Sequence, residues 1–157
     1  MTMAESLIIS DGNKNDRYSV LYSQIRSLLD SESDLIANMA NVSSMIHRTF
    51  GFWWTGFYIV KDGQLVLGPF QGPLACTRIN YGKGVCGTSW ERKMTVIVPD
   101  VELFPGHIAC SSISRSEIVV PIFRGEDVYA VLDIDSKELS TFDETDKVWL
   151  EKITKLL

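Results

Sequence analysis

Residues 116–135 read SEIVVPIFRGEDVYAVLDID, and the central sheet is predicted from this stretch outward. Two runs rich in β-branched and aromatic residues, 116–123 and 127–135, flank the turn residues 124–126. This pattern predicts a β-hairpin. Because side chains alternate between the two faces of a strand, a hairpin with this three-residue turn has one wholly apolar face. We expect that face to carry helices.

The other face of the predicted hairpin carries three carboxylates. With the turn at 124–126, Glu117 lies opposite Asp133, and Asp135 follows one step along the same face. A slip of one residue would place carboxylates in the core, so the apolar pattern favours this register. Like charges opposite each other destabilise a sheet. We expect an ammonium-type ligand, or a carboxyl kept protonated by a raised pKa, to offset that cost. Hydrated surface acids are the alternative interpretation.

A cysteine stands in the polar loop before this hairpin. Residues 104–112 read FPGHIACSS, whereas cysteine is usually buried and acts as a small hydrophobe. We therefore interpret Cys110 as a reactive thiol. The chain has 3 cysteines, without a CxxC pair or a histidine at metal-ligand spacing. This arrangement fits neither a disulfide framework nor a zinc site.

The remaining chain predicts an α+β sandwich with a mainly antiparallel sheet and helices on one face. We expect residues 1–16 to form a flexible N-terminal arm and residues 17–157 to form a single domain. Periodicity predicts helices from about 17 to 29, from a cap at Ser33 to Gly51, over 85–92, and from a cap near Thr141 or Asp143 to Leu157. Further strands are expected at 52–60, 64–70 and 95–98, with an Asp-Gly hairpin turn at 61–63 and a short polar-apolar segment at 77–81.

Composition limits the classes of function. The 157 residues are 45% hydrophobic and 22% charged, which is typical of a globular protein. The net charge of −5, without a run of lysine and arginine, argues against a nucleic-acid partner. No apolar stretch approaches the roughly 18–20 residues needed to span a membrane. We expect a cytoplasmic protein, in a compartment where thiols stay reduced.

Several motifs together resemble those of the free methionine-(R)-sulfoxide reductases, a family of stand-alone GAF-domain enzymes. The resemblance extends from about residue 17 to the C-terminus. It implies a GAF-domain sandwich, with N- and C-terminal helices on one face of the sheet and active-site loops on the other. The motifs are WWTGFY at 53–58, LGPFQG at 67–72, GKGVCG at 82–87, PDV at 99–101, HIAC at 107–110 and LDIDS at 132–136.

The resemblance implies a thiol-dependent reaction. The family's nucleophile matches Cys110, which would attack the sulfoxide sulfur of free methionine-(R)-sulfoxide, release methionine and become a sulfenic acid. A second cysteine would condense with it to form a disulfide, which thioredoxin reduces. The recycling cysteine matches Cys76 or Cys86. We favour Cys76, which lies in the looser loop, while Cys86 opens a helix and packing is its alternative role. No cofactor or metal is implied, and a homodimer is reasonable.

The resemblance also implies the substrate contacts. Glu117, Asp133 and Asp135 match acidic residues of the family. At least one would hold the substrate ammonium, and another, for which Asp135 is the candidate, would hydrogen-bond or protonate the sulfoxide oxygen. Trp54 and Tyr58 share a strand face and match pocket residues, although such aromatic pairs are often core.

Two other readings remain open. A GAF domain can be a non-catalytic sensor that binds a small molecule, and Cys110 can serve a thiol-based redox sensor without a substrate. His107, three residues before Cys110, either assists the thiol or lines the entrance, or it is a plain loop residue.

Overall fold

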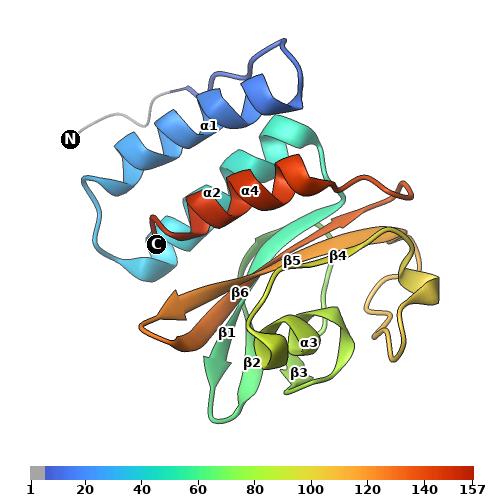
Figure 1. Ribbon diagram of the computed structural model, residues 1–157. Coiled ribbons are helices and arrows are strands. Elements are labelled where there is room, and N and C mark those ends of the chain that lie inside the picture. Colours follow the sequence, from blue (N-terminus) through green and yellow to red (C-terminus); the bar gives the residue numbers. More distant parts are fainter. Residues whose placement is uncertain (1–5) are drawn as a thin grey trace.

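The computed structural model describes residues 6–157, which form an α+β structure built on a six-stranded antiparallel sheet (Figure 1). The strand order is β3-β2-β1-β6-β5-β4, and the β5–β6 hairpin lies beside β1. This confirms the predicted fold class. The strands are β1 (Trp54–Lys61), β2 (Gln64–Gln71), β3 (Arg78–Asn80), β4 (Val96–Val98), β5 (Ser116–Arg124) and β6 (Asp127–Ser136).

Helices cover both faces of the sheet, but unequally. α1 (Lys14–Leu29), α2 (Leu35–Phe50) and α4 (Glu144–Thr154) lie together on one face, and the short α3 (Gly84–Arg92) lies on the other (Figure 1). The first face forms the larger core, where the apolar side of the hairpin packs against the three helices. The second face forms a smaller core around β1 and α3. The site is built on this second face.

The β5–β6 hairpin pairs differently from the prediction. Glu117 lies opposite Asp135, and Asp133 lies opposite Val119. The predicted register, with Glu117 opposite Asp133, is therefore wrong by two residues. Because the error is an even number, side chains before the bulge stay on the predicted faces: the three acids share one side, and the apolar residues of the larger core share the other, namely Ile118, Val120, Ile122, Ala130, Leu132 and Ile134. At the bulge the faces change, because Val128 joins the smaller core and Tyr129 packs against the larger one.

Two local features set this register. The turn is one residue shorter than predicted, because Arg124 pairs with Asp127. A bulge then adds one residue, since Phe123 pairs with Val128 while Ile122 pairs with Ala130. Each feature moves the pairing by one position in the same direction.

Turns and caps define the other elements. Asp62 and Gly63 have φ angles of 49° and 77°, as the predicted type I′ turn between β1 and β2 requires. The side chain of Asp34 caps α2 by accepting from the backbone N–H of Ala37 at 2.8 Å, so the predicted cap at Ser33 is wrong by one residue. Among residues 6–157, each helix is too short or too polar to cross a membrane.

Part of the predicted N-terminal arm lies along α1. Residues 1–5 lie outside the described residues. The backbone N–H of Ile8 donates to the side chain of Gln24 at 2.8 Å, and that side chain donates back to the carbonyl of Ile8 at 2.8 Å. Leu7 packs against the larger core. α1 begins at Lys14, three residues before the predicted start.

Candidate active site

A pocket opens on the sheet face that carries α3. Its floor consists of side chains from β1, β5 and β6, and its walls come from α3 and from the loops around Cys76 and Cys110. The residues proposed from the sequence all line this pocket or form its edge, although they are spread over more than 80 positions of the chain. They are Trp54, Tyr58, Cys76, Cys86, Cys110, Glu117, Asp133 and Asp135.

A disulfide links the two loops above the pocket. It joins Cys76 to Cys110, whose Cα atoms lie 5.5 Å apart. Cys110 is exposed and Cys76 is half-buried, so both belong to the rim of the pocket and not to a core. Cys86, in the first turn of α3, remains a free and buried thiol. The structure therefore pairs Cys110 with Cys76 and keeps Cys86 apart from the bond.

The two aromatic residues of β1 hold the Cys76 loop. The hydroxyl of Tyr58 donates to the carbonyl oxygen of Cys76 at 2.9 Å, and the indole N–H of Trp54 donates to the carbonyl oxygen of Pro73 at 3.1 Å. Their rings stack with centroids 5.9 Å apart. Both side chains are buried, and both line the pocket. They thus serve both as packing residues and as pocket walls. The sequence offers these two roles as alternatives, and the structure combines them.

Glu117 and Asp133 form a buried acidic pair on the floor. Each residue is only 6% exposed. Burial, together with the negative charge of the neighbouring carboxylates, raises the pKa of Glu117 well above its usual value. Burial raises the pKa of Asp133 from 3.8 to about 6. The Oδ1 atom of Asp133 is buried and has no hydrogen-bond partner. Near neutral pH, the pair therefore favours a cation or retains protons.

Asp135 lies beside this pair in a more open position. Its side chain is partly exposed, and its Oδ1 atom accepts a hydrogen bond from the hydroxyl of Ser114 at 2.7 Å. Burial and the charge of Asp133 raise the pKa of Asp135 well above its usual value. A protonated Asp135 can donate a hydrogen bond into the pocket, which an ionised carboxylate cannot do.

Three pocket residues were not identified from the sequence as site residues. Ser114 holds Asp135, and the indole N–H of Trp53 donates to the hydroxyl of Ser111 at 3.3 Å. The two serines belong to the serine-rich run SSISRS at 111–116, in which nothing marks one serine over another. Trp53 stands next to Trp54 in the same motif, but the spacing that pairs Trp54 with Tyr58 on one strand face does not include it.

His107 stands at the entrance. Its Nε2 atom lies 3.9 Å from Oε2 of Glu117, beyond a hydrogen bond but within the range of an ion pair. Burial lowers the pKa of His107, which favours the neutral imidazole. The structure places this residue on the pocket wall, as one of the two sequence readings expects.

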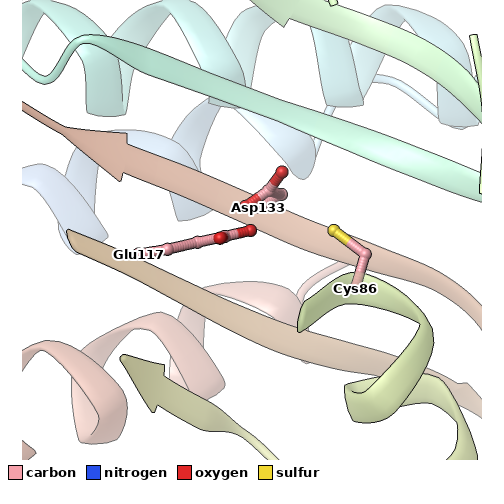
Figure 2. A group of neighbouring side chains, drawn as sticks. All are labelled: Cys86, Glu117 and Asp133. Atoms are coloured by element: carbon pink, nitrogen blue, oxygen red, sulfur yellow. The ribbon is translucent and has the colours of Figure 1, made fainter. Parts of the chain in front are cut away.

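Figure 2 shows how Cys86 joins the acidic pair. Its thiol points from α3 toward the carboxyl groups of Glu117 and Asp133, which extend from β5 and β6. One potential ligand atom from each residue lies within 4.8 Å of the other two, and all three residues are buried. Burial and the nearby carboxylates raise the pKa of Cys86 well above its usual value, so the free thiol stays protonated in the absence of a cation.

The arrangement combines two kinds of chemistry. The cysteine pair at the rim can be reduced from a disulfide to two thiols and oxidised back again. Beneath it, an acidic floor attracts a cation and can supply a proton. Of the described residues that line the pocket, none is lysine or arginine, so phosphate groups find no cationic partner there.

Known proteins resemble this chain over most of its length. The GAF domain family model matches residues 39–157. The chain is 54% identical to GAF domain-containing protein A of Dictyostelium discoideum, with 99% of both chains covered. It is 41% identical to the free methionine-R-sulfoxide reductase of Saccharomyces cerevisiae, covering 94% of this chain and 87% of that protein.

A solved structure is also similar to this chain, in both sequence and fold. The X-ray structure of free methionine-R-sulfoxide reductase from Neisseria meningitidis, in complex with its substrate, superposes with a TM-score of 0.94 at 48% identity. The match covers 96% of this chain and 92% of that chain. With this extent of similarity over nearly the whole length, the chain belongs to the GAF-domain family, in the group of the free methionine-R-sulfoxide reductases.

Proposed function

We propose that this chain reduces free L-methionine-(R)-sulfoxide to methionine through a sulfenic acid on Cys110 and a disulfide with Cys76 that thioredoxin reduces. The observation that carries the proposal is the Cys76–Cys110 disulfide at the rim of a pocket with a buried acidic floor. A redox-active thiol pair and a cation-binding floor are the two parts that this reaction needs.

The first step is oxygen transfer. The thiolate of Cys110 attacks the sulfoxide sulfur, and the S–O bond of the substrate breaks. The oxygen passes to the sulfur of Cys110 and takes up the proton of Asp135, so Cys110 becomes a sulfenic acid. Its sulfur is oxidised by two electrons, while the substrate sulfur is reduced by two and leaves as methionine. A protonated Asp135, held by Ser114, donates a hydrogen bond to the sulfoxide oxygen and makes the sulfur more electrophilic.

The second step regenerates the thiol. The thiol of Cys76 attacks the sulfenic sulfur of Cys110, the S–S bond forms, and the hydroxyl leaves as water. Thioredoxin then supplies two electrons and two protons through thiol–disulfide exchange. The exposure of Cys110 supports this step, because an external dithiol must reach one sulfur of the bond.

Substrate selection follows from the floor. The ammonium group lies between Glu117 and Asp133, where it supplies the partner that Oδ1 of Asp133 lacks. The ring of Trp54 covers the substrate methyl group. A methionine sulfoxide inside a peptide has no free ammonium to place there, so it leaves the buried acids unpaired and is rejected.

The proposal includes a setting for the enzyme. A reaction cycle that returns Cys76 and Cys110 to thiols needs a reducing compartment, so we assign it to the cytoplasm. Nothing in the reaction requires a second subunit, and we keep a homodimer as a hypothesis to be tested by the mass in solution.

The test couples turnover to NADPH oxidation through thioredoxin reductase and thioredoxin. Wild-type protein with free methionine-(R)-sulfoxide is expected to consume NADPH, whereas Cys110→Ser is expected to consume none. Ser112→Ala, an exposed neighbour in the same loop, is the matched control and should retain turnover. The S epimer and an N-acetylated sulfoxide should be poor substrates. Full turnover by Cys110→Ser, or none by the wild type, contradicts the proposal.

The same disulfide also fits a thiol-based redox sensor, which is the second candidate. A sensor would form the Cys76–Cys110 bond with peroxide as the oxidant and would not react with the sulfoxide, so it would release no methionine. Measuring methionine alongside NADPH therefore separates the two functions in one assay.

A further inference from the structure

Cys86, Glu117 and Asp133 converge on one point in the pocket, although they come from α3, β5 and β6 (Figure 2). One thiol sulfur and two carboxylate oxygens lie within 4.8 Å of one another. Zinc bonds of about 2.0 Å to oxygen and about 2.3 Å to sulfur place tetrahedral ligands roughly 3.5 Å apart. Small side-chain rotations are therefore enough for the three atoms to share one metal ion.

A second observation marks this point as a site for a cation. Asp133 is 6% exposed, and its Oδ1 atom is buried with no hydrogen-bond partner. A buried acceptor without a partner destabilises the folded protein, and a bound cation removes this penalty. Of the described residues that line the pocket, none is lysine or arginine, so the chain itself supplies no permanent positive charge to this atom.

The ligand types select the metal. Magnesium and calcium prefer oxygen alone, whereas a thiolate favours zinc and the other soft or borderline ions. Three protein ligands leave a fourth position open toward the pocket, as in zinc sites that retain a water. Zinc has no redox chemistry of its own, so its binding leaves the oxidation state of the cysteines unchanged.

We propose that Cys86, Glu117 and Asp133 form a Zn²⁺ site inside the substrate pocket, and that bound Zn²⁺ excludes the substrate ammonium and so inhibits the reductase. The metal site stands on the geometry alone, while the competition with substrate rests on the proposed function. Cys86 thereby gains a role that is separate from the Cys76–Cys110 disulfide.

Zinc binding is tested on the oxidised protein, in which the disulfide leaves Cys86 as the one free thiol among the 3 cysteines. Zn²⁺ affinity is measured by competition with a chromophoric chelator. Co²⁺ is the spectroscopic probe, since a thiolate-to-cobalt charge-transfer band reports coordination by sulfur. One zinc per chain is expected. Cys86→Ser should abolish the cobalt band, and Asp133→Asn should weaken Zn²⁺ binding by at least about 10-fold.

Asp135→Asn is the matched control. It removes a carboxyl from the same strand face, two positions from Asp133, but Asp135 is outside the cluster. Its loss of zinc affinity should be smaller than that of Asp133→Asn. No zinc binding by the oxidised wild type, or a cobalt band that persists in Cys86→Ser, overturns the site. An equal loss of affinity in Asp133→Asn and Asp135→Asn also overturns it, because it would indicate a nonspecific acidic surface.

The competition is tested on the double variant Cys76→Ser/Cys110→Ser, which keeps Cys86 and cannot turn over. Saturating methionine-(R)-sulfoxide should raise the apparent dissociation constant for zinc at least about 10-fold, and the S epimer much less. Zinc affinity unchanged by a sulfoxide that binds in the same titration overturns the shared position. A sulfoxide that does not bind at all contradicts both the proposed function and the competition. The metal site is then still decided by the zinc affinity and the cobalt band of the oxidised protein.

Discussion

At the scale of single residues, the pocket holds a set of groups that stability alone does not favour. Glu117, Asp133 and Asp135 share one sheet face, and burial raises the pKa of each. Ionising them in the folded protein costs free energy that the unfolded chain does not incur. Such a cluster favours the binding of a cationic ligand at this face. The same acids lower the stability of the ligand-free protein, so binding and stability oppose each other here.

Replacement of Asp133 by asparagine should therefore stabilise the protein at neutral pH. A carboxyl whose folded pKa exceeds its unfolded value binds its proton more tightly in the folded state, so stability falls as the pH rises from about 4 through the pKa of about 6. Asp133→Asn removes this loss. Its gain over wild type should be near zero at pH 4 and on the order of 1–3 kcal/mol at pH 7.5, measured by urea unfolding.

Asp127→Asn serves as the control for that experiment. Asp127 is an exposed residue on the same strand, and its replacement should change stability by less than about 0.5 kcal/mol at either pH. A destabilised Asp133→Asn at pH 7.5, or a gain that does not depend on pH, would show that the carboxyl has a favourable partner in the folded protein.

The three cysteines should behave differently in turnover. Cys76→Ser should release one methionine per chain and then stop with thioredoxin, because the sulfenic acid of Cys110 has lost its partner. Cys86→Ser should continue past the first turnover, since Cys86 is buried apart from the disulfide. Methionine per chain, followed over time by chromatography, gives the result. Continued turnover by Cys76→Ser together with arrest of Cys86→Ser would assign recycling to Cys86.

At the scale of elements, β1 shapes the pocket wall through a glycine. A Cβ atom on Gly56 would lie 2.6 Å from the ring of Trp54 and closer still to Cβ of Phe70. The rings of Trp54 and Phe70 stack there with centroids 5.3 Å apart. Close approach of β1 and β2 at this position thus depends on the missing side chain.

Gly56→Ala should displace Trp54 and lower kcat/KM by about 10- to 100-fold, because a small displacement of a wall residue misplaces the substrate. Gly125→Ala is the control: its φ of 65° makes alanine unfavourable, but nothing lies within 4 Å of the added atom. The control should lose stability and keep kcat/KM. Equal kinetic losses in the two variants would mean that Gly56 acts only through stability.

Element patterns predicted from the sequence agree with the structure where the signal is local. Asp62 and Gly63 form the expected turn, and the apolar side of the β5–β6 hairpin faces the helices. The register is wrong because neither the shorter turn at Arg124 and Asp127 nor the bulge between Ile122 and Phe123 leaves a mark in an apolar pattern. Alternation fixes the face of each side chain, but it leaves shifts by two residues undetermined.

The site divides in the same way. Strand alternation groups the three acids on one face, and family motifs direct attention to Trp54, Tyr58 and the cysteines. Contacts between distant elements could not be predicted in this way. Cys86 lies near Glu117 because α3 packs on the sheet, and Ser114 contacts Asp135 because of the backbone path of the loop before β5. Neither contact has a sequence spacing that could indicate it.

At the scale of the whole molecule, the sheet separates two tasks. One face packs against α1, α2 and α4 and forms the larger core, while the other holds the pocket and the smaller core (Figure 1). The loops at the rim are tied by a disulfide between residues 34 positions apart. The redox state of the rim should therefore affect the stability of the whole protein.

Reduction of this disulfide should destabilise the protein. Closing a loop of 34 residues lowers the entropy of the unfolded chain by an amount worth up to about 4 kcal/mol. Scanning calorimetry with and without reductant should show a lower Tm in the reduced protein, by up to roughly 10 °C. The Tm of Cys76→Ser should not respond to reductant. An equal response of that variant would trace the effect to something other than this bond.

In the proposed reaction, Cys110 takes oxygen from the sulfoxide and then pairs with Cys76. The most direct test mixes fully reduced protein with one equivalent of free methionine-(R)-sulfoxide, blocks the remaining thiols and maps the peptides by mass spectrometry. We predict one methionine per chain, a peptide pair joined through Cys76 and Cys110, and an alkylated Cys86. Disulfide formation without methionine, or a bond that includes Cys86 instead of Cys76, would contradict the account.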